Sequence, residues 1–150
     1  MMFFDRHCHI HMPQFDNERE DVVKRMREAQ ITQSVVVATE VAELDAVSAL
    51  AQENAGIYTA FAVSPQDEEL PDLTAEEIAK IVSRPKMVAV GETGLDYHYC
   101  HEPLDWQRKR FATHIEAANL INKPLIIHSR EAEDDTIAIL KENHADRCGF

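Results

Sequence analysis

The sequence predicts an α/β fold with a mostly parallel sheet. Apolar runs typical of strands alternate with segments of helical periodicity along the whole chain. Several of these runs are continuous, as expected for strands covered on both faces. The chain has 150 residues, of which 45% are hydrophobic, and this is enough for one domain with its own core. We therefore expect a single domain in which each strand leads into a helix.

Five strands are predicted from short apolar runs, and a sixth could begin within 147–150. The five are Met2–Phe4, Ser34–Ala38, Tyr58–Val63, Met87–Val90 and Leu125–Ile127. Five helices are predicted between and after them. They are Asp16–Ala29, Glu40–Asn54, Thr74–Ser83, Trp106–Ile121 and Asp134–Asn143. The order is βαβαβαβαβα, which is either a small open α/β domain or the first part of a longer barrel of about 250 residues.

The helices carry different local signals. In the first, Val22 and Met26 recur at helical spacing. The second has its apolar residues on one stripe and ends near Asn54, a residue suited to a helix C-terminus. The third begins with Thr74, and Glu77 follows three residues later, which is the pattern of a capping box. The fourth is the longest, and the fifth follows the last predicted strand.

Side chains that bind metals follow three of the predicted strands. His7 and His9 come after the first strand, Glu92 after the fourth and His128 after the fifth. In parallel α/β folds the carboxyl ends of the strands meet at one rim, so these four side chains should converge. Each alone has an ordinary explanation as a loop, cap or core residue, but together they favour a metal site.

The spacing of the two N-terminal histidines has a physical reason. A period of two places the rings of His7 and His9 on one side of a strand, where both could reach a single ion about 2.0–2.2 Å away. The two oxygens of Glu92 could bridge a pair of metal ions, and His128 would serve the second ion. Cys8, between the histidines, should point to the opposite face as a free thiol.

Composition limits the function and the location. The net charge of −12 argues against a protein that coats nucleic acid non-specifically, although bound metal ions could supply positive charge to a nuclease. No apolar run approaches the roughly 20 residues of a membrane span. Three cysteines at scattered spacing do not indicate a disulfide framework. We therefore expect a cytoplasmic protein that does not bind membranes.

Three segments resemble the TatD family of metal-dependent hydrolases, which belongs to the amidohydrolase-like barrels. They read FFDRHCHIHM, VAVGETGLDYHY and QRKRFATHIEAANLINKPLIIHSREAEDDTIAIL. The resemblance covers the whole chain and implies a (β/α)8 TIM barrel, of which about five βα units are present. Residues 1–150 would then be the N-terminal part of one barrel domain. The family's further ligands, from the sixth and eighth strands, would lie outside these residues.

The resemblance also implies a function and roles for the site residues. It implies a deoxyribonuclease with 3'-5' exonuclease character that holds two divalent metal ions, Mg, Mn or Zn, and acts on DNA or another phosphodiester. His7 and His9 would hold one metal ion, His128 the other, and Glu92, the catalytic residue of this segment, both. Arg130 is a candidate for contacting a substrate phosphate, or simply a surface arginine.

Two departures from the family pattern leave other functions open. His11 stands where the family usually has an aspartate, and Ser64 where it has an active-site histidine. One alternative is an amidohydrolase-like enzyme that acts on a C–N or C–O bond of a small molecule, to which Ser64 and the charge of −12 give weight. The other is a non-catalytic fragment, because five strands do not close an eight-stranded barrel.

Overall fold

The computed structural model describes residues 1–145 and 148–149, and its strands form one parallel sheet in chain order, β1-β2-β3-β4-β5-β6. The strands are β1 Phe3–Cys8, β2 Ile31–Ala38, β3 Ile57–Phe61, β4 Met87–Asp96, β5 Leu125–Arg130 and β6 Cys148–Gly149. The α-helices are α1 Arg19–Glu28, α2 Leu44–Glu53, α3 Ala75–Val82, α4 Asp105–Ile121 and α5 Glu133–Glu142. Short 3-10 helices, η1 Pro13–Phe15 and η2 Val41–Glu43, precede α1 and α2.

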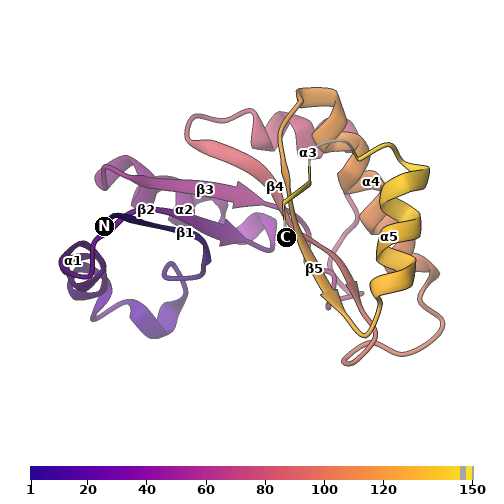
Figure 1. Cartoon of the computed structure of the whole chain (residues 1–150), viewed down its shortest axis with the longest axis horizontal. Coiled ribbons are helices and arrows are strands. Elements are labelled where there is room, and N and C mark those ends of the chain that lie inside the picture. Colours follow the sequence, from indigo (N-terminus) through magenta and orange to yellow (C-terminus); the bar gives the residue numbers. More distant parts are fainter. Residues whose placement is uncertain (146–147, 150) are drawn as a thin grey trace.

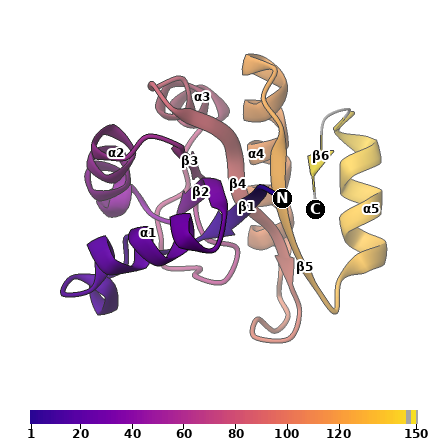
Figure 2. The same ribbon diagram turned by 60° about the vertical axis from the view of Figure 1, so that its left-hand side comes forward.

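The sheet is curled, and the strand direction turns steadily from β1 to β5 (Figure 1). A second view shows the helices arranged around the outside of this curl (Figure 2). Within the described residues, β1 and β6 form the two edges of the sheet and are not paired with each other. The molecule is thus an open, barrel-type sheet of five βα units and the beginning of a sixth strand, as the sequence predicted. Residues 147 and 150 of the predicted sixth strand lie outside the described residues.

The sheet is apolar on both faces. In β2, Val36 and Ala38 belong to the large core between sheet and helices, while Val35 and Val37 belong to a smaller cluster on the inner face. Alternate residues of one strand therefore enter different cores, which explains why β2 reads as a continuous apolar run.

Three strands extend further than their apolar runs predicted. β1 reaches Cys8, β4 reaches Asp96 and β5 reaches Arg130. Pairing between β4 and β5 continues to the partners Asp96 and Arg130, so the backbone ladder outlasts the apolar pattern. As a result His7, Glu92 and His128 lie inside strands near the rim, not beyond them.

The helices follow the prediction with small shifts at their ends. The predicted first helix, Asp16–Ala29, is η1 and the shorter α1, and the predicted second, Glu40–Asn54, is η2 and α2. At the start of α3, the hydroxyl of Thr74 accepts from the backbone N–H of Glu77, whose carboxylate accepts from the backbone N–H of Thr74. The predicted capping box is therefore confirmed.

Candidate metal centre

The first strand brings two imidazoles together. The rings of His7 and His9 have their centroids 5.0 Å apart and their Nε2 atoms 3.1 Å apart. The Nδ1–H of His9 donates to the carbonyl oxygen of Val37 at 2.9 Å. Because a carbonyl can only accept, this bond fixes the proton on Nδ1 and leaves the Nε2 of His9 with a lone pair. The lone pair faces His7, in the orientation needed to bind a cation.

β4 adds a carboxylate to this pair. Oε2 of Glu92 lies 3.2 Å from Nε2 of His7 and 3.8 Å from Nε2 of His9. One ligand atom from each of the three residues lies within 4.8 Å of the others. Two imidazole nitrogens and a carboxylate oxygen are donors that divalent transition metals prefer. The donor set, with the lone pair of His9 directed at its neighbours, therefore fits a divalent cation.

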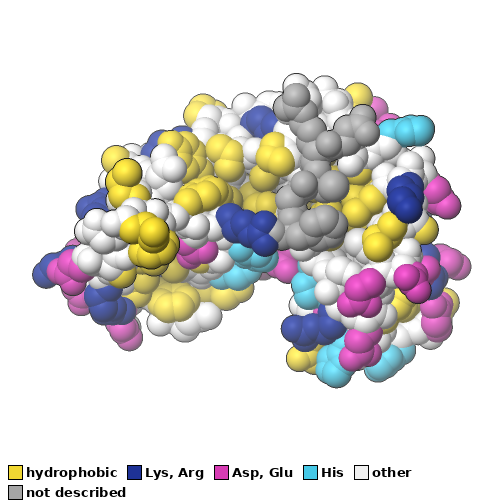
Figure 3. Space-filling model, in the orientation of Figure 1, with side chains coloured by type: hydrophobic (Ala, Val, Ile, Leu, Met, Phe, Trp, Pro, Cys, Tyr) yellow, Lys and Arg dark blue, Asp and Glu magenta, His cyan; other side chains and the backbone are white. Residues whose placement is uncertain are grey.

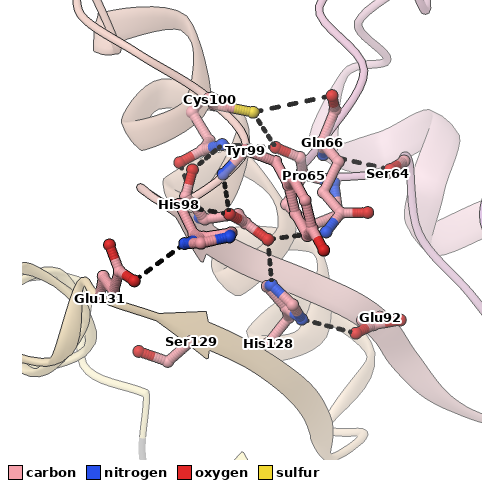
Figure 4. A network of polar contacts seen from close by, with 12 residues as sticks. Ser64, Pro65, Gln66, Glu92, His98, Tyr99, Cys100, His128, Ser129 and Glu131 are labelled. Carbon is pink, nitrogen blue, oxygen red and sulfur yellow. Dashed lines mark hydrogen bonds and ion pairs between the residues drawn. The ribbon is translucent and has the colours of Figure 1, made fainter.

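The other oxygen of Glu92 meets β5. Its Oε1 lies 2.9 Å from Nδ1 of His128, so one carboxylate connects the β1 histidines to the β5 histidine. The opposite ring nitrogen of His128, Nε2, lies 2.8 Å from Oδ2 of Asp96. Figure 4 shows His128 between Glu92 on one side and the loop of His98 and Tyr99 on the other. The four residues predicted from sequence do converge at one rim.

Asp96 is fully buried and holds this side of the centre together. Its Oδ1 accepts from the backbone N–H groups of His98 and Tyr99, at 3.0 and 2.8 Å. Its Oδ2 accepts from the amide of Gln66 at 2.6 Å as well as from His128. Burial alone would raise the pKa of the Asp96 carboxyl, but these hydrogen bonds outweigh it and lower the pKa to about 2.

Burial and hydrogen bonding also determine the pKa values of Glu92, His128 and His9. Burial would raise the pKa of Glu92, yet the hydrogen bonds from His128 and His7 hold it well below its usual range. The bond to Glu92 raises the pKa of His128, against the effect of burial and with the help of Asp96. Burial lowers the pKa of His9, which favours the neutral ring that metals bind.

A glycine in β4 permits the close approach of β5. Gly94 pairs with His128 and has φ of 143°. A Cβ at this position would lie 2.0 Å from the carbonyl oxygen of His128. Only glycine accepts both the backbone conformation and the contact, so the GETG segment is what allows His128 to sit beside Glu92.

Solvent reaches the two sides of the site to different extents. Figure 3 shows the underside of the molecule hollowed between its two halves, with histidine side chains on both sides of the hollow. The side chains of His7 and His9 are 31% and 28% exposed, whereas those of His128 and Glu92 are 16% and 19% exposed. A substrate could therefore reach the β1 side of the centre from solvent.

His11 does not share the face of His7 and His9. The chain turns after β1, and Nε2 of the buried His11 lies 3.2 Å from Oε1 of Glu43, on the other side of the turn. Cys8 is a free thiol that packs against the core between sheet and helices, as predicted, and burial raises its pKa to about 11. Neither residue contributes to the cluster.

Two further sequence predictions fall beside the centre. The guanidinium of Arg130 lies over the ring of the exposed Tyr99, 5.1 Å from its centroid. Ser64 is in the loop after β3, where its hydroxyl accepts from the backbone N–H of Gln66 at 3.1 Å. The side chain of Gln66 in turn reaches Asp96, so this loop contributes an amide to the site.

Asp96 is not among the four metal ligands that the sequence predicted. The available signal was period two along β4, since Glu92, Gly94 and Asp96 are alternate residues and share a face. That signal was hidden because the apolar run ends at Val90 and the central residue of the three has no side chain. Gln66 had no sequence signal, because it lies in a loop whose path is set by tertiary packing.

An open barrel-type sheet with histidines and a carboxylate at the carboxyl ends of its strands defines a class of α/β proteins with a candidate metal centre. The chain belongs to a family within that class, TatD related DNase, whose model matches residues 4–150. Among the described residues, no helix is long and apolar enough to cross a membrane.

Individual relatives agree with this assignment. The chain is 35% identical over 151 residues to the "uncharacterized metal-dependent hydrolase YabD" of Bacillus subtilis, covering 99% of this chain and 58% of YabD. It is 35% identical over 131 residues to the "uncharacterized metal-dependent hydrolase TatD" of Mycobacterium tuberculosis, covering 83% of this chain and 49% of that protein. The chain thus spans roughly half to three fifths of the length of these relatives.

Solved structures show the same fold. The crystal structure of YjjV, a TatD homologue from Escherichia coli, matches with a TM-score of 0.88 at 30% identity, over 98% of this chain and 58% of YjjV. A TatD family hydrolase from Entamoeba histolytica matches with a TM-score of 0.80 at 16% identity, over 96% of this chain and 55% of that one. The predicted fold class, an incomplete (β/α)8 barrel, is confirmed.

Proposed function

We propose that this chain carries the β1, β4 and β5 part of the metal centre of a phosphodiester hydrolase, a deoxyribonuclease with 3'-5' exonuclease character. The observation that carries the proposal is Glu92, whose two oxygens face different histidine groups. Oε2 faces His7 and His9, and Oε1 faces His128. A carboxylate in this position suits a bridge between two divalent cations, Mg, Mn or Zn.

His7, His9, Glu92 and His128 would hold the cations. Bound divalent cations would supply Lewis acidity and a water of lowered pKa for attack on a phosphodiester. On the β1 side, the bond to Val37 keeps the proton of His9 away from the site. On the β5 side, Asp96 holds Nε2 of His128, so Nδ1 is the nitrogen that faces the site.

The family supports DNA as substrate, and so does the chemistry of the centre. The family model is described as TatD related DNase, and relatives are named metal-dependent hydrolases. Paired cations offset the negative charge that develops on a phosphoryl group, which a protein of net charge −12 could not do through its own field. Arg130, two residues beyond His128, is the nearest candidate on β5 for an additional phosphate contact.

A second function is favoured by one observation. Ser64 stands where the resemblance implies a histidine, its hydroxyl accepts from the backbone N–H of Gln66, and the Gln66 amide donates to Asp96. This more polar, uncharged lining suits hydrolysis of a C–N or C–O bond in a small neutral molecule. The alternative is therefore an amidohydrolase-like enzyme that uses the same metal ligands.

The test compares wild-type protein with Glu92→Gln. Metal binding by each protein is measured by calorimetric titration with Mn²⁺ and with Zn²⁺. Hydrolysis is assayed on single-stranded DNA, a small phosphodiester, an amide and a lactone. We expect metal binding to weaken by more than about 100-fold in the variant, since a bridging ligand and its charge are lost. We expect the wild-type protein to hydrolyse DNA and the Glu92→Gln variant not to do so. Cleavage of amide or lactone without DNA favours the alternative, and equal metal binding in both proteins removes Glu92 from the centre.

A further inference from the structure

An exposed aromatic ring stands next to the candidate metal centre. Tyr99 is 63% exposed, and the guanidinium of Arg130 lies 5.1 Å from the centroid of its ring. The ring of His98 meets Tyr99 edge to face, with centroids 4.7 Å apart and planes at 85°. Tyr99 thus contributes little to the core and presents its ring to solvent together with two other planar, nitrogen-containing groups.

Tyr99, His98 and Arg130 form a rim beside the centre, and hydrogen bonds fix the backbone of its loop. The backbone N–H groups of His98 and Tyr99 both donate to Oδ1 of the buried Asp96. The carboxylate of Glu131 lies 2.9 Å from Nδ1 of His98, which joins the loop after β4 to the loop after β5. Because the backbone of this loop is already fixed, a ligand that packs on Tyr99 has only the side chain to order.

The rim is also adjacent to the metal ligands. Asp96 accepts from Tyr99 through one oxygen and contacts His128 through the other, so a single carboxylate separates them. Figure 4 shows His98 and Tyr99 on the side of His128 that faces away from Glu92. Arg130 follows His128 at the period-two position of β5. A ligand group bound beside Glu92 and His128 would therefore extend onto the rim formed by Tyr99 and Arg130.

The chemistry of the rim suits a nucleobase. Bases in single strands stack on aromatic rings and on arginine planes, and arginine also pairs with phosphate oxygens. The net charge of −12 makes such local contacts more important here, because the overall field repels a polyanion. Within Figure 3, lysine or arginine side chains lie next to histidines at the end of the molecule that contains the end of β5.

We propose that Tyr99 and Arg130 form a stacking subsite for a nucleobase of single-stranded nucleic acid, next to the phosphodiester presented to the metal centre. This inference rests on the proposed function and assigns a base-binding role to two residues outside the metal ligands. Tyr99 supplies the stacking surface, and Arg130 contacts the adjoining phosphate. Asp96 positions the subsite relative to His128.

The test measures binding of two short fluorescein-labelled single-stranded oligodeoxynucleotides, one normal and one with abasic sites, by fluorescence anisotropy in Ca²⁺ buffer. Tyr99→Leu removes the ring, Tyr99→Phe retains it, and Phe4→Leu is the matched control, since Phe4 is 58% exposed at the far end of β1. We expect Tyr99→Leu to bind the normal oligonucleotide roughly tenfold more weakly and the abasic one unchanged. Tyr99→Phe and Phe4→Leu should bind both as the wild type does.

Arg130→Met should weaken binding of both oligonucleotides and reduce the salt dependence of binding, because it removes a phosphate contact. The inference is overturned if Tyr99→Leu affects both oligonucleotides equally or neither, or if the wild-type protein does not prefer the normal one. If the protein hydrolyses no phosphodiester but Tyr99→Leu weakens binding of the normal oligonucleotide only, the proposed function is contradicted and the stacking subsite is supported. If the protein hydrolyses DNA but Tyr99→Leu does not weaken binding in this way, the proposed function is supported and the stacking subsite is contradicted.

Discussion

The two sides of the candidate centre are built differently. On the β1 side, His7 and His9 are nearly one-third exposed, and their Nε2 atoms face each other and Glu92. On the β4–β5 side, His128 is more buried and has a carboxylate at each ring nitrogen. On the first side the Nε2 of His9 keeps a lone pair for a cation, whereas both ring nitrogens of His128 on the second side are in contact with carboxylates.

The difference suggests that one side of the centre determines metal affinity and the other determines the geometry of the ligands. The Nε2 of His9 carries no proton that a cation must displace, so the β1 side should contribute mainly affinity. A network anchored on the buried Asp96 is stable without a cation, so the β4–β5 side should contribute mainly geometry. Substitutions on the two sides should therefore differ in whether they change folding stability, metal affinity or both.

The largest effect is expected where the β4–β5 side is tightest. Gly94→Ala would place a methyl group 2.0 Å from the carbonyl oxygen of His128, on a residue with φ of 143°. We expect a loss of about 3 kcal/mol in the free energy of unfolding, together with loss of metal binding in the protein that still folds. The measurements are urea unfolding and calorimetric titration with Zn²⁺.

Gly56→Ala is the matched control, because its Cβ would lie 2.3 Å from the carbonyl oxygen of Thr32 at the opposite end of the sheet. It should lower stability to a similar extent and leave the metal affinity of the folded protein unchanged. Equal loss of metal affinity in both variants would show that any destabilisation disrupts the centre, and would remove the special role of Gly94.

The second prediction sets one histidine of each side against the other. His128→Ala leaves Oδ2 of the buried Asp96 without its imidazole donor, so we expect about 2 kcal/mol less stability as well as weaker Zn²⁺ binding. His7→Ala removes a ligand that is about one-third exposed, so we expect weaker Zn²⁺ binding with stability within about 0.5 kcal/mol of wild type. Unfolding curves without metal and Zn²⁺ titrations give both quantities, and equal destabilisation by the two variants would abolish the distinction.

The third prediction uses a buried histidine that has no carboxylate against its ring nitrogens. His114 accepts from the backbone N–H of Val63 at its Nε2 and donates from Nδ1 to the carbonyl of Arg110. Burial lowers its pKa to about 4, the opposite of the shift at His128. The unfolded state then binds more protons, so its contribution to stability is complete above about pH 6.5 and declines as the pH falls toward 4.

His114→Gln keeps an acceptor for Val63 and cannot titrate. Between about pH 7 and about pH 4.5, the wild type should lose about 2 kcal/mol more stability than this variant, as measured by urea unfolding at both pH values. Parallel pH profiles for the two proteins would mean that burial does not keep His114 neutral. The contrast with His128, whose pKa is raised by the carboxylates of Glu92 and Asp96, would then lose its support.

The smallest loss of metal affinity is expected from Asp96→Asn. The amide keeps an oxygen for the backbone N–H groups of His98 and Tyr99, but its nitrogen replaces the oxygen that accepts from Gln66 and His128. We expect Zn²⁺ affinity to fall by about tenfold to 100-fold, since the carboxylate only orients a ligand. A loss as large as that of Glu92→Gln would indicate that Asp96 is itself a ligand.

Much of the fold and the candidate site follows from sequence because the fold is parallel. Once apolar runs alternate with helical segments, the carboxyl ends of the strands must share a rim, and the side chains after three runs must meet there. His7, Glu92 and His128 are brought together on this ground alone. The local signal of the capping box at Thr74 likewise gives the start of α3.

What the sequence could not predict depends on where strands end. Because β4 continues six residues past Val90, the fully buried Asp96 joins the face of Glu92 instead of lying in a loop. Because β1 ends at Cys8, the period-two pattern fails at His11, which turns toward Glu43. Both boundaries are set by pairing with neighbouring strands, and hydrophobic periodicity does not report that pairing.

Anomalous X-ray diffraction from crystals grown with zinc tests the shared metal centre most directly. Shared coordination predicts anomalous density within ligand distance of Glu92, with Nε2 of His7 and His9 on the Oε2 side and His128 on the Oε1 side. Density elsewhere on the protein, or none at saturating zinc, with Glu92 still hydrogen-bonded to histidine alone, would contradict it.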